Sequence, residues 1–168
     1  NGSDCSGQKL KGIDLSGMPM LTIDFSDSFL GNANMRAANL SGSNFNNAYL
    51  GKADLRDTAI VHAATQSETD FQARSFYKAD FRGAFLQSVV VNKSQFYGSK
   101  WNKATLNNVR LTDSDFRTAN FSNARFFGKN NMTRNVLTNT IWDDAKISKQ
   151  TDFSGSGNCP KALGQKCN

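Results

Sequence analysis

A large apolar residue recurs at every fifth position over most of the chain, and this spacing constrains the fold more than any other feature. In the stretch ANLSGSNFNNAYLGKADLRDTAI these residues are Leu40, Phe45, Leu50, Leu55 and Ile60. An α-helix repeats at about 3.6 residues and a β-strand at 2, so neither explains a period of five. A small residue (Ala, Ser or Thr) stands two positions before each of them. The repeat therefore indicates units of five residues, each with one large and one small inward side chain.

The register of five extends from Cys5 to Phe153, and Asp or Asn often directly precedes the apolar residue, as in KADL, KADF and TANF. This pattern resembles the pentapeptide-repeat family, whose consensus is A(D/N)LXX. The resemblance implies an all-β fold, a right-handed quadrilateral β-helix (solenoid) of about seven coils in which five residues form each side of a square. It covers residues 5–153, with residues 1–4 as an N-terminal tail and 154–168 as a C-terminal cap.

Interruptions of the register decide which sides of successive coils stack. We predict irregular segments at 61–70, where Thr65 replaces the apolar residue, and at 127–131, each with one inserted residue. At four units per coil, one insertion at the first segment stacks Leu55 on Phe76. The predicted interior column is Leu15, Met35, Leu55, Phe76, Phe96, Phe116 and Leu137.

The C-terminal segment SGSGNCPKALGQKCN leaves the register. The end of a solenoid exposes unpaired backbone and core, so we predict that residues 160–166 form a helical turn that covers the last coil. Cys159 and Cys167 flank this turn. We predict a disulfide between them, which is typical of an oxidising compartment; two reduced thiols in a cytosolic protein are the alternative. Cys5 lies at the opposite end of the rod, too far away to pair with either.

Motifs of catalytic, metal or cofactor sites do not occur in the sequence. It contains no C-x-x-C pair, no G-x-S-x-G, no Walker loop and no Rossmann fingerprint. The one histidine, His62, falls in the first irregular segment and is predicted to be a surface residue. The sequence therefore predicts a protein that is not an enzyme, with no catalytic residues, no metal and no cofactor.

The candidate binding residues lie on the predicted outer surface. In the predicted register, one basic and aromatic stripe forms a candidate interaction face: Arg36, Arg56, Tyr77, Lys78, Tyr97 and Arg117. Such a stripe is suited to holding phosphates and stacking bases, or it is ordinary solvated charge with tyrosines packed on arginine stems. Apolar residues at outward positions form a candidate protein contact if they cluster: Phe29, Tyr49, Phe85 and Phe127.

These features favour a non-enzymatic protein-interaction scaffold, exported to a periplasm or thylakoid lumen, as an assembly or accessory factor of a larger complex; a cytoplasmic location is the alternative. The chain is predicted to act as a monomer or as a dimer through a solenoid end. No apolar run is long enough to span a membrane. Family members that protect DNA gyrase or topoisomerase as DNA mimics need a negative surface, which the net charge of +6 disfavours. Nucleic-acid binding through the Arg/Tyr stripe is the other alternative.

Overall fold

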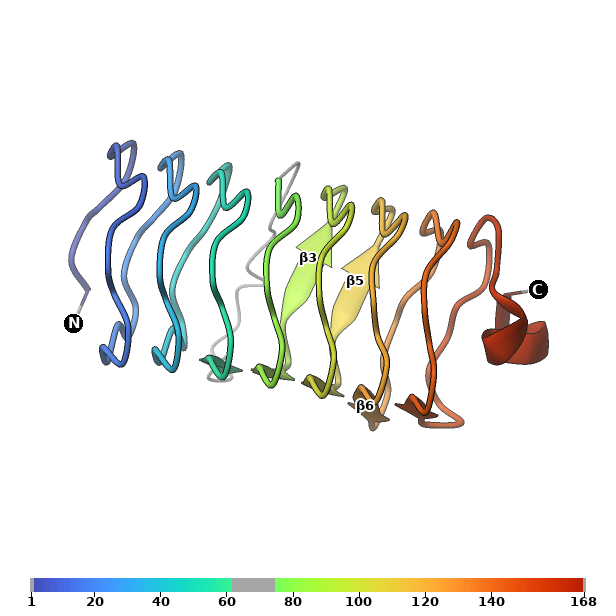
Figure 1. The fold of residues 1–168 in the computed structure, drawn as a ribbon. Coiled ribbons are helices and arrows are strands. Elements are labelled where there is room, and N and C mark those ends of the chain that lie inside the picture. Colours follow the sequence, from blue (N-terminus) through green and yellow to red (C-terminus); the bar gives the residue numbers. More distant parts are fainter. Residues whose placement is uncertain (1, 62–74, 168) are drawn as a thin grey trace.

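The computed structural model describes residues 2–61 and 75–167, which form a rod of stacked coils (Figure 1). Each side of a coil pairs in parallel with the same side of the next. One ladder of bridges passes through Lys9, Phe29, Tyr49, Ser75, Gln95, Asp115, Val136 and Gly157. This ladder contains eight residues, one from each successive coil, whereas the repeat predicted about seven coils. The fold is the predicted all-β solenoid, with the apolar residue of each unit pointing inward.

Short strands form where the pairing between coils is most regular. One sheet runs along the lower edge of the rod in Figure 1, in the order β1 (Ala59–Val61), β2 (Phe85–Gln87), β4 (Thr105–Asn107), β6 (Arg125–Phe127) and β7 (Lys146–Ile147). A second sheet pairs β3 (Val90–Asn92) with β5 (Arg110–Thr112). All of these pairs are parallel.

Turns at the corners of the square explain the polar part of each repeat. The second corner residue has a positive φ, as in Lys78 (53°), Gly98 (67°) and Thr118 (59°) of successive coils. The residue before each apolar centre stabilises the turn that follows: the Asp115 carboxylate accepts a hydrogen bond from the backbone N–H of Arg117 at 3.0 Å. The frequent Asp and Asn at this position therefore belong to the fold.

The stacking predicted across residues 61–75 is wrong by one side of the square. Asp54 pairs with Asp80, 26 residues later, where the single predicted insertion required 21. The interior column that contains Leu55 therefore continues with Phe81 and not with Phe76, as the bond from the Leu55 N–H to the Asp80 carbonyl confirms. Thr65 and His62 lie outside the described residues, as does nearly all of the predicted segment 61–70. Six additional residues, rather than one, separate the two regular arrays.

The second predicted irregular segment, 127–131, coincides with the first of two successive coils that are each one residue longer than the regular ones. Arg110 pairs with Asn131 and Asn131 with Asp152, each pair being 21 residues apart. Two buried asparagines, Asn130 and Asn135, occupy small-residue positions in this coil. Their side chains bond to backbone groups of the neighbouring coils, which satisfies donors and acceptors in the core.

A 3-10 helix, η1 (Lys161–Cys167), closes the C-terminal end of the rod. Its Leu163 is buried against the core. The predicted disulfide is present: Cys159 and Cys167 are bonded, with their Cα atoms 6.0 Å apart. Cys5 is a free, half-buried thiol in the first coil. The helical turn and the cysteine pair were thus both predictable from the segment that leaves the register.

The disulfide is expected to hold the cap on the last coil. Closure of a loop this short restricts the unfolded chain, so Cys159→Ser should lower the free energy of unfolding by about 2 kcal/mol. Denaturant unfolding with and without dithiothreitol measures the effect. Reductant should reproduce the loss in the wild type and in a Cys5→Ser control, and it should leave Cys159→Ser unchanged. Equal stability of reduced and oxidised wild type would contradict this role.

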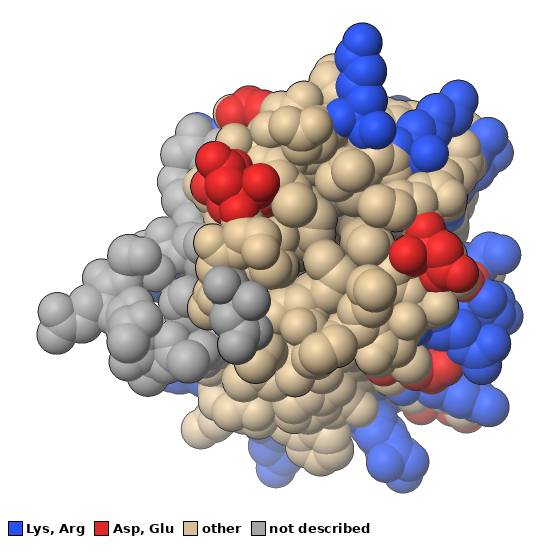
Figure 2. All heavy atoms as spheres, turned by 90° about the vertical axis from the view of Figure 1, so that its left-hand side faces the viewer, with Lys and Arg blue, Asp and Glu red and all other residues tan. Residues whose placement is uncertain are grey.

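The N-terminal end of the rod is different in chemistry. Viewed along the rod, the centre of this end is uncharged, and lysine and arginine side chains lie at its periphery (Figure 2). Met18, at a small-residue position of the first coil, is 49% exposed, and Leu10 and Met20 are only partly buried. This end therefore presents apolar side chains through which an end-to-end contact would form.

Candidate interaction surface

Two tyrosines of successive coils form the centre of an aromatic surface on one corner of the rod. Tyr77 and Tyr97 both follow directly after an inward phenylalanine, and their rings stack with centroids 5.7 Å apart at an angle of 8°. The Arg117 guanidinium lies 5.7 Å from the Tyr97 ring centroid, and the Lys78 ammonium 5.1 Å from that of Tyr77. The row thus has cations at its end and at its side, in cation–π geometry.

Tyr49 extends this row toward the N-terminus. Its ring covers Gly31 and Gly51: a Cβ atom on Gly51 would overlap the ring, and one on Gly31 would approach it to 2.9 Å. Gly51 occupies the corner position one coil before Tyr77, because the next N–H, that of Lys52, bonds to the Tyr77 carbonyl. Because these two corner residues lack side chains, the Tyr49 ring has space to pack directly on their backbone.

Phe29 adjoins Tyr49 in the preceding coil, where the two residues form a backbone bridge. Phe29 is 54% exposed and Tyr49 is 44% exposed, whereas this position is usually polar. We call the four residues Phe29, Tyr49, Tyr77 and Tyr97 the aromatic ridge. It runs along one corner of the rod and ends at Arg117.

The predicted basic and aromatic stripe does not exist as one surface. Because the register shifts by one side of the square, Arg36 and Arg56 continue into Arg82, on the corner after the ridge. Tyr77, Lys78, Tyr97 and Arg117 lie together as predicted, without the two N-terminal arginines. The sequence-based face therefore divides into a tyrosine corner and an arginine corner.

The arginines of both corners are paired with aspartates: Arg36 with Asp57, and Arg56, Arg82 and Arg117 each with the aspartate two residues earlier. Arg82 lies 2.7 Å from Asp80, and Arg117 lies 2.6 Å from Asp115. Arg56 pairs with Asp54 in the same way. The hydrogen bond from Arg117 holds the pKa of the Asp115 carboxyl below its usual value, so the pair stays ionised at neutral pH. These pairs neutralise most of the positive charge on which the stripe was proposed.

The predicted apolar contact is divided as well. Phe29 and Tyr49 are brought together, but Phe85 lies in β2 beside Ala59 and Thr105, on a different side of the square. Phe127 lies at the end of β6, beside Asn107. Both of these side chains are exposed singly among the described residues. Single exposed apolar residues are ordinary on protein surfaces, so neither marks a contact.

Sequence reasoning missed the link between Tyr49 and the tyrosine corner. The available signal was the pair of glycines directly after Leu30 and Leu50, where the other coils carry side chains. Such glycines make room for a ring from the same coil. Without the correct register, however, Gly51 could not be placed next to Tyr77.

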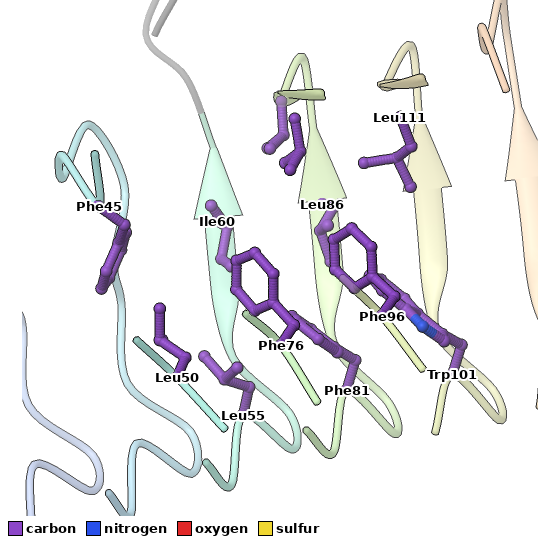
Figure 3. A pocket seen from close by; sticks show the side chains of 12 residues that line it. Phe45, Leu50, Leu55, Ile60, Phe76, Phe81, Leu86, Phe96, Trp101 and Leu111 are labelled. Carbon is purple, nitrogen blue, oxygen red and sulfur yellow. The ribbon is translucent and has the colours of Figure 1, made fainter. Parts of the chain in front are cut away.

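An internal cavity lies between successive coils near the start of the C-terminal array (Figure 3). Its volume is about 30 Å³, and it is lined only by apolar atoms of residues such as Leu55, Ile60 and Phe76. Ligand pockets usually measure about 300–1,000 Å³. The cavity is therefore a gap in core packing and not a site for a small molecule.

The described residues contain no group of three or more His, Cys, Asp or Glu side chains that could hold a metal ion. The only histidine, His62, lies outside them. Likewise, no helix within 2–61 and 75–167 has the length and hydropathy that a membrane crossing requires.

Comparison with known proteins identifies the repeat. A family model described as pentapeptide repeats matches residues 23–57 and 92–128, with eight copies in all. Both segments lie in the regular coils described above, and the bridges continue the same five-residue units beyond them. The chain therefore contains pentapeptide repeats in these two segments. The sequence has no significant match among curated proteins.

Among solved structures, the chain is similar to HetL, a pentapeptide-repeat protein involved in heterocyst differentiation regulation in the cyanobacterium Nostoc sp. strain PCC 7120. The TM-score is 0.77 at 22% identity, over 91% of this chain and 67% of HetL. QnrB1, a plasmid-mediated fluoroquinolone resistance protein, matches at 17% identity over 88% of this chain and 91% of its own, with a TM-score of 0.49. A thylakoid-lumen pentapeptide-repeat protein of Arabidopsis thaliana matches at 23% identity over 94% and 72%, with a TM-score of 0.17. The similarity to HetL supports the fold, whereas the TM-scores of the other two structures are too low to support it.

Proposed function

We propose that the protein is a non-enzymatic interaction scaffold that binds a protein partner through the aromatic ridge. The observation that supports this proposal is the alignment of the four aromatic residues in successive coils along one corner of the rod. Tyrosine and arginine are the residue types most enriched among those that dominate protein–protein binding energy. The ridge combines both at its C-terminal end, where Arg117 lies over Tyr97.

The ridge is also held in place before any partner binds. Tyr77 and Tyr97 stack on each other, and the Tyr49 ring is seated on two glycines. Side chains that are already ordered lose little entropy on association, which favours affinity. The coils beneath are fixed by backbone bonds, such as that from the Lys78 N–H to the Tyr97 carbonyl at 2.9 Å.

Export to a periplasm or thylakoid lumen is part of the proposal, together with a role as an assembly or accessory factor of a larger complex. The disulfide between Cys159 and Cys167 supports it, because such bonds persist mainly in oxidising compartments. Counting free thiols in protein purified from its source under alkylating conditions tests the compartment: one free thiol, that of Cys5, is expected. Three free thiols would contradict export.

The two nucleic-acid alternatives have less support. A DNA mimic needs a surface of unpaired carboxylates, whereas Asp54, Asp80 and Asp115 each face an arginine. Direct binding of nucleic acid needs several unpaired cations beside the tyrosines, whereas Arg117 is already bonded to Asp115 and Lys78 is the one further cation in contact with a tyrosine ring among the described residues. A protein partner requires neither.

Affinity capture from an extract of the source organism, with mass spectrometry, tests the ridge. We expect the double variant Tyr77→Ala/Tyr97→Ala to lose the partner, because each central aromatic contributes about 2 kcal/mol, or about thirtyfold in Kd. The matched control is Phe85→Ala/Phe127→Ala, which removes two exposed aromatic rings from the sheet that contains β2 and β6, on another side of the rod. Equal capture by both variants would contradict the proposal. Sedimentation of the same samples distinguishes a monomer from a dimer through a solenoid end.

A further inference from the structure

A groove of about 380 Å³ lies on the C-terminal half of the rod, away from the ridge. It lies where one corner of the square meets the sheet of β4, β6 and β7. Its lining, which we call the basic groove, consists of Lys103, Thr105, Asn123, Arg125, Asp144 and Lys146. Three cations and one carboxylate give this surface a net charge of +2.

Among the described residues, the cations of the basic groove take part in no ion pair, unlike the arginines of the two corners described above. Arg36, Arg56, Arg82, Arg117 and Arg134 each pair with an aspartate. Arg125 and Lys146, by contrast, take part in none of the ion pairs within the described residues. They are direct neighbours in the parallel register of β6 and β7, so two like charges face each other about 4.8 Å apart at the backbone. Such a pair is unfavourable unless an anion lies between the two side chains.

The groove is rigidly built. Thr105, Arg125 and Lys146 occupy successive rungs of one sheet, at outward positions. The other three residues, Lys103, Asn123 and Asp144, occupy the second corner position of the same three coils, with φ values of 61°, 60° and 56°. Each side chain therefore projects from a backbone that the coil above and the coil below hold in place.

We propose that the basic groove binds the phosphate group of a small phosphate monoester. Such a group carries about −1.5 to −2 charges at pH 7, which matches the net charge of the groove. The Arg125 guanidinium can bind two oxygens at once, while Lys103 and Lys146 supply point charges. The Thr105 hydroxyl and the Asn123 amide are further donors at the same surface. A volume of about 380 Å³ also leaves room for the organic part of the ester.

Asp144 provides an internal test of the assignment, because it is the only acidic residue among the described residues that line the groove. Its carboxylate repels a bound phosphate, so the variant Asp144→Asn should bind more tightly. A surface that merely accumulates lysine and arginine predicts no such dependence on a single side chain.

Titration calorimetry of the intact protein with inorganic phosphate and with glucose 6-phosphate, at constant ionic strength, measures the binding. We expect Arg125→Gln/Lys146→Gln to weaken saturable binding at least about tenfold. Asp144→Asn should strengthen it about threefold, the size expected of one exposed charge. Lys9→Gln/Lys11→Gln, which removes two cations of the first coil, should leave it unchanged.

The two ligands distinguish the sources of the phosphate. Tighter binding of glucose 6-phosphate than of inorganic phosphate indicates an ester, and equal binding indicates the free anion; both support the groove. Absence of saturable binding, or binding that the four groove and control substitutions weaken alike, would overturn the proposal. Circular dichroism of each variant confirms that the coils are intact, since all the altered side chains are exposed.

Discussion

Replacement of Trp101 by alanine should destabilise the rod strongly, because it empties the middle of the aromatic column. Trp101 is 1% exposed and lies between two rings of the same column, with its centroid 4.0 Å from that of Phe81 and 5.6 Å from that of Phe121. Its indole N–H donates to the Ser99 hydroxyl at 2.8 Å. Removal leaves a cavity in the middle of the stack and takes away the donor to the Ser99 hydroxyl, which keeps its own bond to the Phe96 carbonyl, so we expect a loss of about 3–5 kcal/mol.

Urea unfolding followed by circular dichroism measures this loss. Phe127→Ala, which removes a ring that is 51% exposed, is the control and should change the free energy of unfolding by less than about 1 kcal/mol. Similar losses in the two variants would mean that the aromatic column does not hold the coils together. Trp142 remains in Trp101→Ala, so its fluorescence reports whether the C-terminal coils unfold separately from the rest.

The second large effect is expected at Asn135, a buried polar residue in the core. Its side-chain oxygen accepts the backbone N–H of Ser114 at 2.9 Å, and its amide donates to the carbonyls of Leu111 and Met132 at 2.7 Å each. Asn135→Ala leaves the Ser114 N–H and the Leu111 carbonyl without these partners in the interior, and it removes one of the two donors to the Met132 carbonyl, which keeps the Ser156 hydroxyl. At about 1 kcal/mol or more for each hydrogen bond lost, we expect a loss of about 3 kcal/mol.

Asn135→Ser is the matched comparison. Serine occupies the same column one coil earlier and one coil later, and there its hydroxyl accepts the N–H of the preceding coil. Serine at position 135 can restore the acceptor for Ser114 but cannot reach both carbonyls, so it should lose less than alanine. If alanine were tolerated as well as serine, the hydrogen bonds of Asn135 would not be what stabilises this longer coil.

Most of the fold could be predicted from the sequence because the five residues of each repeat are enough to specify its local structure. One large inward residue, one small inward residue and one Asp or Asn before the centre specify a side and its corner without reference to distant residues. The inward residues Leu40, Phe96 and Phe121 are all buried as the register predicts. The C-terminal cap was predictable because it breaks that register.

The stacking of the two arrays could not be predicted, since periodicity fixes spacing and not the side of the square. Phe71 stands five positions before Phe76, as it would in a regular repeat. The six additional residues were therefore interpreted as one five-residue unit and one inserted residue. A shift of five residues keeps every apolar residue inside while moving each outward residue to the next corner. This is why the core was predicted well and the candidate surface was divided.

The contacts of the ridge depended on that register. The stack of Tyr77 on Tyr97 follows from a spacing of twenty within one array, and it was predictable. Gly51 and Tyr77 lie on opposite sides of the interruption between residues 61 and 75, so their proximity could not be predicted. A repeat pattern that treats all outward positions as polar also cannot predict that an aromatic ring packs on a corner glycine of the same coil.

Site-specific photo-crosslinking tests most directly whether the aromatic ridge is the interaction face. Benzoylphenylalanine placed at Tyr49, Tyr77 or Tyr97, in separate proteins, should give the same protein adduct in an extract of the source organism. The same probe at Phe85 or Phe127 should give none, because both residues belong to the sheet of β2 and β6, on another side of the rod. Adducts of equal yield at Phe85, or no adduct at any of the three tyrosines, would contradict the account.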